Sequence, residues 1–202
     1  AASDVYKRQG TGRKLLLFTT VAINLAPLLY YKYTNFSIEL FNQILHTNFS
    51  PLTIVLPIGI SFYTFQAISY STDIYRKRFT TRVSPLEYLF YISFFPLLLA
   101  GPITRAGHFF RQLRNRQPVS QRLLHLGLWL IITGLVKKAV IADYIAQYNN
   151  WIFDSPETYS GLENLMGVIG YTVQIHCDFS GYSDISIGLA AMMGIRLRDN
   201  FR

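Results

Sequence analysis

The chain has 202 residues, of which 50% are hydrophobic and only 15% charged, and its mean hydropathy is +0.23. A charged fraction this far below the roughly 25% of an ordinary soluble domain argues against a soluble globule and against disorder. One cysteine excludes a disulfide scaffold, and four scattered histidines give no basis for a metal site. The net charge of +8 comes from lysines and arginines clustered between apolar runs, a pattern typical of membrane-span flanks rather than of a nucleic-acid-binding surface.

The amino-terminal segment, residues 1–9, is polar, lacks a Met start and does not lead into a signal peptide. We interpret it as an adapter-like or non-native leader, with a native cytoplasmic tail as the alternative, and treat residues 10–202 as part of one membrane domain. The uncharged run Leu15–Tyr31, between basic flanks, predicts a first span that needs help from those flanks to cross the bilayer. Asn35–Asn48 mixes apolar and polar residues and predicts an interfacial helix.

The run Pro51–Thr72 contains 22 uncharged residues and as a helix would reach about 33 Å, which predicts a second span. Tyr63, Gln66 and Tyr70 follow one helical face, and Asp73 continues it. A polar face is costly in lipid, so we expect it to point into the protein or into a wet cavity. Hydrogen bonding between helices and lining of a substrate site both remain open for these residues.

The next element is predicted to begin at a capping box, Ser84-Pro85-Leu86-Glu87. Its apolar body, Tyr88–Thr104, is interrupted by Pro96 and by Gly101-Pro102, and it has basic residues at both ends. Two basic ends conflict with a simple crossing, so we predict a broken or re-entrant helix that is tolerated only if buried in protein. Phe109, Phe110 and Leu113 then alternate with arginines, which favours a short helix on the membrane surface.

The remaining two apolar stretches are separated by an acidic loop around Asp154 and Glu163, which we expect to be external. Before it, Leu123–Val136 is followed by Lys137 and Lys138 and then by more apolar sequence to Phe153. One long tilted helix and a short span followed by an interfacial helix both fit. After it, Leu165–Ile195 predicts a last span that ends at basic residues on the cytoplasmic side.

Asp178 and Asp184 lie inside this last apolar run. An aspartate at the centre of a membrane helix costs roughly 2.5 to 3.5 kcal/mol, so both must face partners inside the protein. Their six-residue separation puts them about 120° apart on a continuous helix, which excludes a paired dyad unless the helix breaks at Gly181. Gln174, Asp178 and Tyr182 share a face, for which site architecture and simple packing are both plausible. The fold class expected is all-α, a polytopic transmembrane helical bundle.

Several motifs in one order resemble the bacterial membrane-bound O-acyltransferases. They are residues 57–66 (PIGISFYTFQ), residues 94–103 (FFPLLLAGPI) and, above all, residues 178–184 (DFSGYSD), followed by Ile187-Gly188-Leu189 and Asn200-Phe201. The branch of this family concerned with alginate O-acetylation is the nearer resemblance, and the one concerned with teichoic acid D-alanylation is more distant. Residues 10–202 are therefore expected to form a partial domain of this family.

The resemblance implies transfer of an acyl group, acetyl in the first instance, across a bacterial inner membrane by a multi-pass protein in the lipid bilayer. The implied donor is cytoplasmic, acetyl-CoA or an acyl carrier protein, and the implied acceptor is an extracellular polysaccharide or a periplasmic acetyl-relay protein. The family's general base is a histidine in a Trp-His segment downstream of Asn200-Phe201, and none of His46, His108, His125 and His176 matches it. No catalytic residue is therefore assigned in this stretch, which we expect to be inactive by itself.

Motif and polarity together nominate a set of residues that shape and hydrogen-bond a substrate cavity: Tyr63, Gln66, Tyr70, Gly101, Pro102, Asp178, Ser180, Tyr182 and Asp184. No cofactor or metal is expected. Two alternatives from other classes stay open. A secondary transporter or flippase also uses broken helices and buried carboxylates, and a non-catalytic membrane subunit would use the polar stripes only for contacts between helices.

Overall fold

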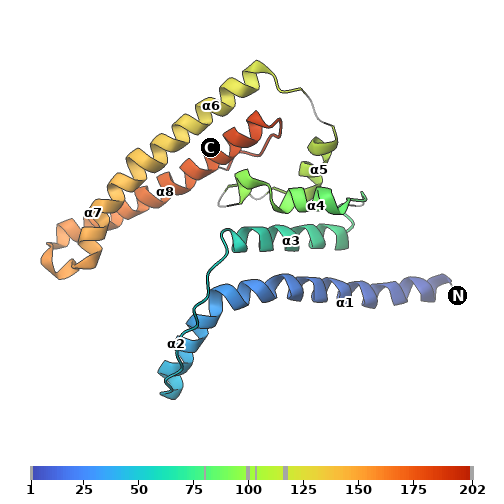
Figure 1. Ribbon diagram of the computed structural model, residues 1–202, viewed down its shortest axis with the longest axis horizontal. Helices are drawn as coiled ribbons and strands as arrows, with labels where there is room; N and C mark the ends of the chain where they lie inside the picture. Colours follow the sequence, from blue (N-terminus) through green and yellow to red (C-terminus); the bar gives the residue numbers. More distant parts are fainter. Residues whose placement is uncertain (1, 80, 99–100, 103, 116–117, 201–202) are drawn as a thin grey trace. The chain divides into compact units, whose positions relative to one another are not determined.

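The computed structural model describes residues 2–79, 81–98, 101–102, 104–115 and 118–200, with side chains from residue 12 onward. Within this part of the chain all regular structure is helical, which confirms the all-α class (Figure 1). The elements are α1 (Ala2–Leu28), η1 (Leu29–Tyr33), α2 (Thr34–Leu45), α3 (Ile60–Tyr75), α4 (Pro85–Ile92), η2 (Phe95–Leu97), α5 (Ala106–Arg114), α6 (Gln121–Leu135), η3 (Val136–Ala142), α7 (Asp143–Asp154), η4 (Pro156–Thr158) and α8 (Gly161–Met192).

Two stretches of the described chain, Gly12–Leu45 and Gln121–Asp154, are each 34 residues long and apolar enough to cross a membrane by length and composition. The chain divides into two compact units, residues 1–94 with 105–110 and residues 95–104 with 111–202. Each unit contains one of these stretches.

In the first unit, α1 continues through the π-helical turn η1 into α2, so the predicted span Leu15–Tyr31 and the predicted helix Asn35–Asn48 form one helical run. The run ends where His46 adopts a left-handed conformation, with φ of 51°. α1 packs along α3, and the Arg13 guanidinium donates a hydrogen bond of 3.0 Å to the Tyr75 carbonyl oxygen.

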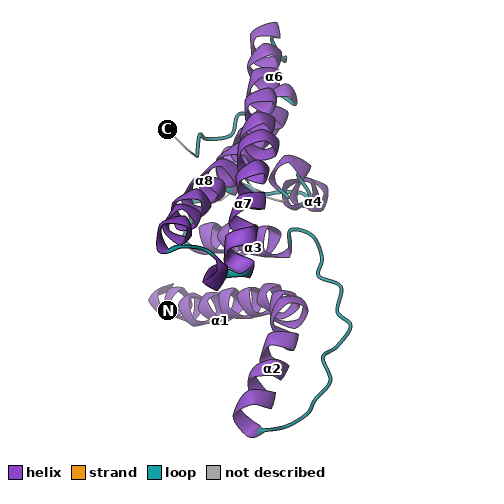
Figure 2. Ribbon diagram, turned by 90° about the vertical axis from the view of Figure 1, so that its left-hand side faces the viewer, coloured by secondary structure: helices purple, strands orange, loops and turns teal. Residues whose placement is uncertain are grey.

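The prediction of one continuous span over Pro51–Thr72 is wrong. The chain from residue 46 to residue 57 is not helical, and α3 begins only at Ile60, after Gly59 with φ of 74° (Figure 2). Pro51 and Pro57 lack a backbone N–H and disfavour helical geometry in the residue before them, so two prolines six residues apart disfavour a helix over this part of the run. A single proline, Pro27, is accommodated inside α1.

Two asparagines of α2 hold this extended segment. The Asn42 side chain accepts a hydrogen bond from the Phe49 N–H and donates one to the Phe49 carbonyl, both at 2.9 Å. Asn35 makes the same pair of bonds with Leu52, also at 2.9 Å each. Each side-chain amide therefore satisfies a backbone N–H and C=O much as a neighbouring β-strand would.

The polar face of α3 points into protein, as predicted. Gln66 is buried and its Nε2 donates to the Tyr91 carbonyl oxygen at 3.3 Å. Tyr70 lies in an aromatic cluster, with its ring centroid 5.1 Å from that of Tyr88 and 6.1 Å from that of Phe110. These contacts are of the kind expected for hydrogen bonding and packing between helices.

The capping box that starts α4 is confirmed, with both hydrogen bonds between Ser84 and Glu87 present. The short helix predicted around Phe109 is also confirmed as α5. However, Phe109 and Phe110 are buried and stack on aromatic rings of α3, α4 and the loop between them, such as Phe79 and Tyr91. The apolar side of α5 is therefore covered by protein and does not face lipid.

The break predicted after α4 is confirmed. η2 is a single short 3₁₀ turn that contains Pro96, and the next α-helix begins only at Ala106. Gly101, in the second unit, has φ of 139°, in the region that favours glycine. A Cβ at this position would lie 2.9 Å from Ser186 Oγ, so glycine lets the chain pass close to α8. Re-entry of this element into the membrane stays a prediction.

The second unit is dominated by two long antiparallel helical runs, α6–η3–α7 and α8 (Figure 1). The first run is uninterrupted from Gln121 to Asp154, which resolves the choice around Lys137 and Lys138 in favour of one long helix. α8 is also continuous and does not break at Gly181.

Glycines bring these two runs into close contact. A Cβ at Gly181 would lie 2.8 Å from the Gly134 carbonyl oxygen, and one at Gly188 would lie 2.5 Å from that of Gly127. Small residues of this kind let membrane helices approach at the backbone. The contact fixes the register of α8 against α6, and with it the positions of the polar side chains on both helices.

Candidate functional site

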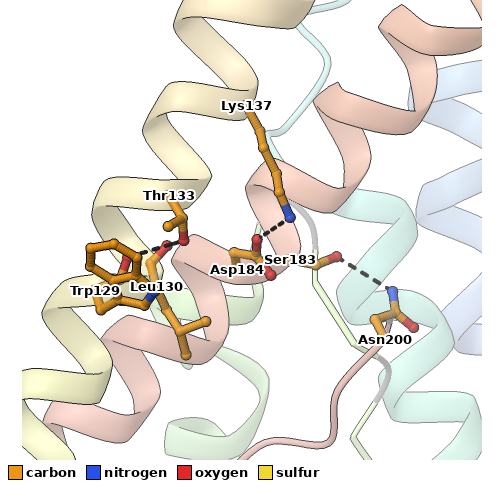
Figure 3. Close-up of polar contacts among 7 residues, drawn as sticks. All are labelled: Trp129, Leu130, Thr133, Lys137, Ser183, Asp184 and Asn200. Atoms are coloured by element: carbon orange, nitrogen blue, oxygen red, sulfur yellow. Dashed lines mark hydrogen bonds and ion pairs between the residues drawn. The ribbon is translucent and has the colours of Figure 1, made fainter. Parts of the chain in front are cut away.

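The centre of the candidate site is an ion pair between the two long helices. Lys137 Nζ donates to Asp184 Oδ2 at 2.6 Å, as Figure 3 shows. The Lys137 side chain is 38% exposed and that of Asp184 is 19% exposed within the chain. The carboxylate therefore faces a partner inside the protein, which is the arrangement that the cost of an intramembrane aspartate requires.

A second lysine forms a small charged network beside this pair. Lys138 Nζ lies 2.7 Å from Asp178 Oδ1 and 2.7 Å from Asp143 Oδ1, and 5.6 Å from the centroid of the Tyr182 ring. One ammonium therefore contacts two carboxylates and an aromatic face, all attractive to a cation. The network joins the turn η3, the first residue of α7 and the middle of α8.

The two ion pairs lie on opposite flanks of α8. Asp178 and Asp184 are about 120° apart around the helix, and Gly181 lies midway between them. A Cβ at Gly181 would be 3.2 Å from Lys137 Cβ and 3.1 Å from the Lys138 backbone nitrogen. The glycine thus sits against the two lysines, and each lysine reaches around its own side of α8 to an aspartate. This angular separation is too wide for a carboxylate dyad, but it lets each aspartate pair with a different lysine. We call these four residues, Lys137, Lys138, Asp178 and Asp184, the clamp.

Both lysines belong to a π-helical turn, η3, and its wider winding distinguishes it from the α-helix on either side. Such turns are rare and occur frequently at functional sites. Here the turn places two consecutive cations against one neighbouring helix at the middle of a membrane-length run.

Hydroxyl groups line the adjoining part of α8. Ser180 is 1% exposed, and its hydroxyl has no hydrogen-bond partner among the described residues. Ser183 is equally buried and accepts a hydrogen bond of 3.4 Å from Asn200 Nδ2, which draws the chain after α8 back onto that helix (Figure 3). Ser186 lies against Gly101.

Six of the nine predicted site residues belong to the second unit: Gly101, Pro102, Asp178, Ser180, Tyr182 and Asp184. Of these, Asp178 and Tyr182 both contact Lys138, Asp184 contacts Lys137, and Gly101 lies against Ser186 of α8. The other three, on α3, belong to the first unit, where Gln66 and Tyr70 make the packing contacts described above. Gln174, predicted to share a face with Asp178, lies with its side-chain amide 2.8 Å from that of Asn149 on α7.

Sequence reasoning missed Lys137 and Lys138 as site residues, because it treated them as an interruption between two apolar runs. One signal could have found them. Two lysines in one membrane-length helix and two aspartates in the next are each costly alone, and the most economical solution is to pair them.

The chain is similar to a known protein family over most of its length. The family model described as MBOAT, membrane-bound O-acyltransferase family, matches residues 14–202. The match includes both long helical runs of the second unit and all nine predicted site residues.

Curated relatives cover most of the chain. It is 38% identical to a "Probable alginate O-acetylase AlgI" of Pseudomonas aeruginosa, over 92% of this chain and 36% of that protein. It is 34% identical to a "Peptidoglycan O-acetyltransferase" of Helicobacter pylori, over 94% of this chain and 41% of that protein. Similarity extends at 27% identity to a "Teichoic acid D-alanyltransferase" of Bacillus subtilis, over 75% of this chain and 39% of that protein. The chain spans 36% to 41% of the lengths of these relatives, and it belongs to the membrane-bound O-acyltransferase family.

Proposed function

We propose that this chain is part of a multi-pass enzyme of the bacterial inner membrane that transfers an acyl group, acetyl in the first instance, to an extracellular polysaccharide or to a periplasmic acetyl-relay protein. The donor in this proposal is cytoplasmic, acetyl-CoA or an acyl carrier protein. Relatives named for alginate and peptidoglycan O-acetylation support acetyl as the group and a polysaccharide as the acceptor.

The observation that carries the proposal is the clamp at the DFSGYSD motif. Asp178 and Asp184 are both held by lysines of the neighbouring helix, at 2.7 and 2.6 Å. Between them are the buried Ser180 hydroxyl and Tyr182. Charged and polar groups held between two apolar helices are expensive to maintain in a membrane and are by default candidates for a functional site.

Acyl transfer from a thioester needs few operations. The oxygen of the acceptor hydroxyl attacks the carbonyl carbon, the bond from that carbon to sulfur breaks, the thiol departs, and a base takes the hydroxyl proton. Donors must stabilise the oxyanion that forms on the carbonyl oxygen. We assign Asp178, Ser180, Tyr182 and Asp184 to shaping and hydrogen-bonding the cavity in which the hydroxyl approaches, and Gly101 and Pro102 to its wall. Tyr63, Gln66 and Tyr70 complete the proposed set.

The test replaces each motif aspartate by asparagine, which keeps the shape and removes the charge. Asp178→Asn and Asp184→Asn are made in the full-length protein, and base-released acetate on the cell's extracellular polysaccharide is measured at matched membrane levels. Asp154→Asn, an exposed aspartate at the end of α7, is the control. We expect at least a tenfold loss of acetylation in both motif variants and wild-type acetylation in the control. Wild-type output from both motif variants would remove the aspartates from the site.

A further inference from the structure

A recess of about 620 Å³ lies in the second unit, where α6 begins and α8 ends. Figure 1 shows these two helix ends next to each other. The volume is in the range of sites that take a small ligand or part of a larger one. The recess lies at the other end of α6 from the clamp, since Gln121 is about 24 Å from Lys137 along the helix.

One wall of the recess is an apolar stripe. Leu123, Leu126 and Leu130 follow i, i+3, i+7 spacing on one face of α6, and Ile187 of α8 lies opposite them. The stripe runs about 10 Å from the start of α6 toward the membrane interior. Leu126 is 50% exposed, so the stripe is open to whatever surrounds this part of the chain.

The mouth of the recess carries an excess of positive charge. Arg122 and Arg196 line it together with one carboxylate, Asp199. Neither guanidinium forms an ion pair in the part of the chain that the structure describes. The first turn of α6 adds the positive end of a helix dipole, because Ser120 caps only the Leu123 N–H.

The chain that forms the other wall is fixed in place. The Gln112 side chain donates to the Arg196 carbonyl oxygen at 2.9 Å and accepts from the Arg196 N–H at 2.7 Å. Leu197, the next residue, is buried. Arg196 is therefore held at the mouth by its backbone, while its guanidinium remains available to a ligand.

We propose that this recess binds an anionic phospholipid. The phosphate lies between the guanidinium groups of Arg122 and Arg196, and one acyl chain lies along Leu123, Leu126 and Leu130. Two arginines match a phosphate, and an apolar stripe that begins beside them matches the chain attached to it. A free phosphate would leave the stripe uncovered, and a lipid without a phosphate would leave the arginines unmatched. This inference does not depend on the proposed acyl transfer.

The test uses the full-length protein, purified in mild detergent and incubated with phosphatidylglycerol. Native mass spectrometry counts the bound lipid in the wild type, in an Arg122→Gln/Arg196→Gln double variant, and in Arg198→Gln. Arg198 is an exposed arginine that does not line the recess and serves as the matched control. We expect the double variant to retain at least tenfold less phosphatidylglycerol and the control to retain the wild-type amount.

A second variant keeps the test decisive if the double variant does not fold. Leu126→Trp fills the stripe, whereas Leu128→Trp places the same side chain at a position of almost equal exposure, 51%, outside the recess. Only Leu126→Trp should displace the lipid. Equal retention in all variants overturns the proposal, as does displacement by acetyl-CoA, which would assign the recess to the acyl donor. Equal thermal stabilisation by inorganic phosphate and by phosphatidylglycerol also overturns it, because a lipid site must use the chain.

Discussion

Loss of one partner in the Lys137–Asp184 pair should destabilise the protein more than loss of both. Lys137 is near the middle of the 34-residue run Gln121–Asp154. The Asp184→Ala variant leaves the Lys137 ammonium without this partner. An unpaired charge destabilises a protein by about 2.5 to 3.5 kcal/mol at the centre of a membrane helix and by about 3 to 5 kcal/mol in a protein interior. Because the two side chains are 38% and 19% exposed, we take the lower end, about 2 to 3 kcal/mol.

The Lys137→Ala/Asp184→Ala variant carries neither charge and should lose only about 1 kcal/mol of packing and hydrogen bonding. The coupling free energy between the two positions is then about 2 kcal/mol or more. Exchange of the residues, Lys137→Asp with Asp184→Lys, should recover most of the stability. The cycle consists of the wild type, Lys137→Ala, Asp184→Ala and the double-alanine variant, and reversible unfolding of the full-length protein in lipid bicelles measures their four free energies.

The same cycle at Lys138 and Asp143 is the matched control, because their 2.7 Å pair is local in sequence and the Asp143 side chain is 51% exposed. Its coupling should stay below about 1 kcal/mol. Additive effects at Lys137 and Asp184, within about 0.5 kcal/mol, would refute the reasoning, because they would mean that neither charge depends on the other. The exchanged variant adds a functional readout. If it regains stability but not acetylation, Asp184 is needed at its own position and not merely as a partner.

Three further predictions concern single contacts. Gly181→Ala should cost about 1 to 3 kcal/mol in the same unfolding assay, since its Cβ would lie 2.8 Å from the Gly134 carbonyl oxygen, whereas Gly161→Ala, with nothing within 4 Å, should be close to neutral. Asn42→Leu removes both bonds to Phe49, so limited proteolysis should cut the loop after α2 faster than in the wild type. Hydrogen bonds from Ser160 lower the pKa of Glu163, so this contact stabilises the start of α8 at neutral pH and loses that effect as pH falls through the lowered pKa. Hydrogen exchange of the first turn of α8 should show this loss, and Ser160→Ala should reduce it, because only the backbone N–H of residue 160 then donates to Glu163.

Local sequence signals predicted most helix positions because the forces that set them are local. The Ser84 box fixes where α4 begins, and proline with glycine at Gly101-Pro102 keeps the chain out of a helix. The Ser160 box, which starts α8 at Gly161, was missed, and α8 begins before the predicted Leu165. The error over Pro51–Thr72 has a non-local cause. Hydropathy depends only on the residues of the run itself, and these are uncharged. It carries no information on Asn35, 17 residues from Leu52, whose side chain makes the hydrogen bonds that the extended chain needs.

The candidate site was predictable in part. An aspartate within an apolar run is conspicuous in any sequence, so Asp178 and Asp184 could be found without coordinates. The cost of four charges in two apolar helices could have pointed to Lys137 and Lys138 as partners, but which lysine pairs with which aspartate depends on the helix register. The register depends on the glycine contacts between α6 and α8 and on the π-helical winding of η3, neither of which follows from hydrophobic periodicity.

The clamp also sets an order of events during synthesis. Asp184 follows Lys137 by 47 residues, so at about 5 to 20 residues per second the ribosome needs roughly 2 to 9 seconds to make the second partner after the first. Throughout that delay Lys137 lacks its partner, whereas Asp143, one of the two partners of Lys138, follows that lysine by only five residues. We therefore expect the charge of Lys137 to favour insertion of the first long helix together with α8, as a hairpin.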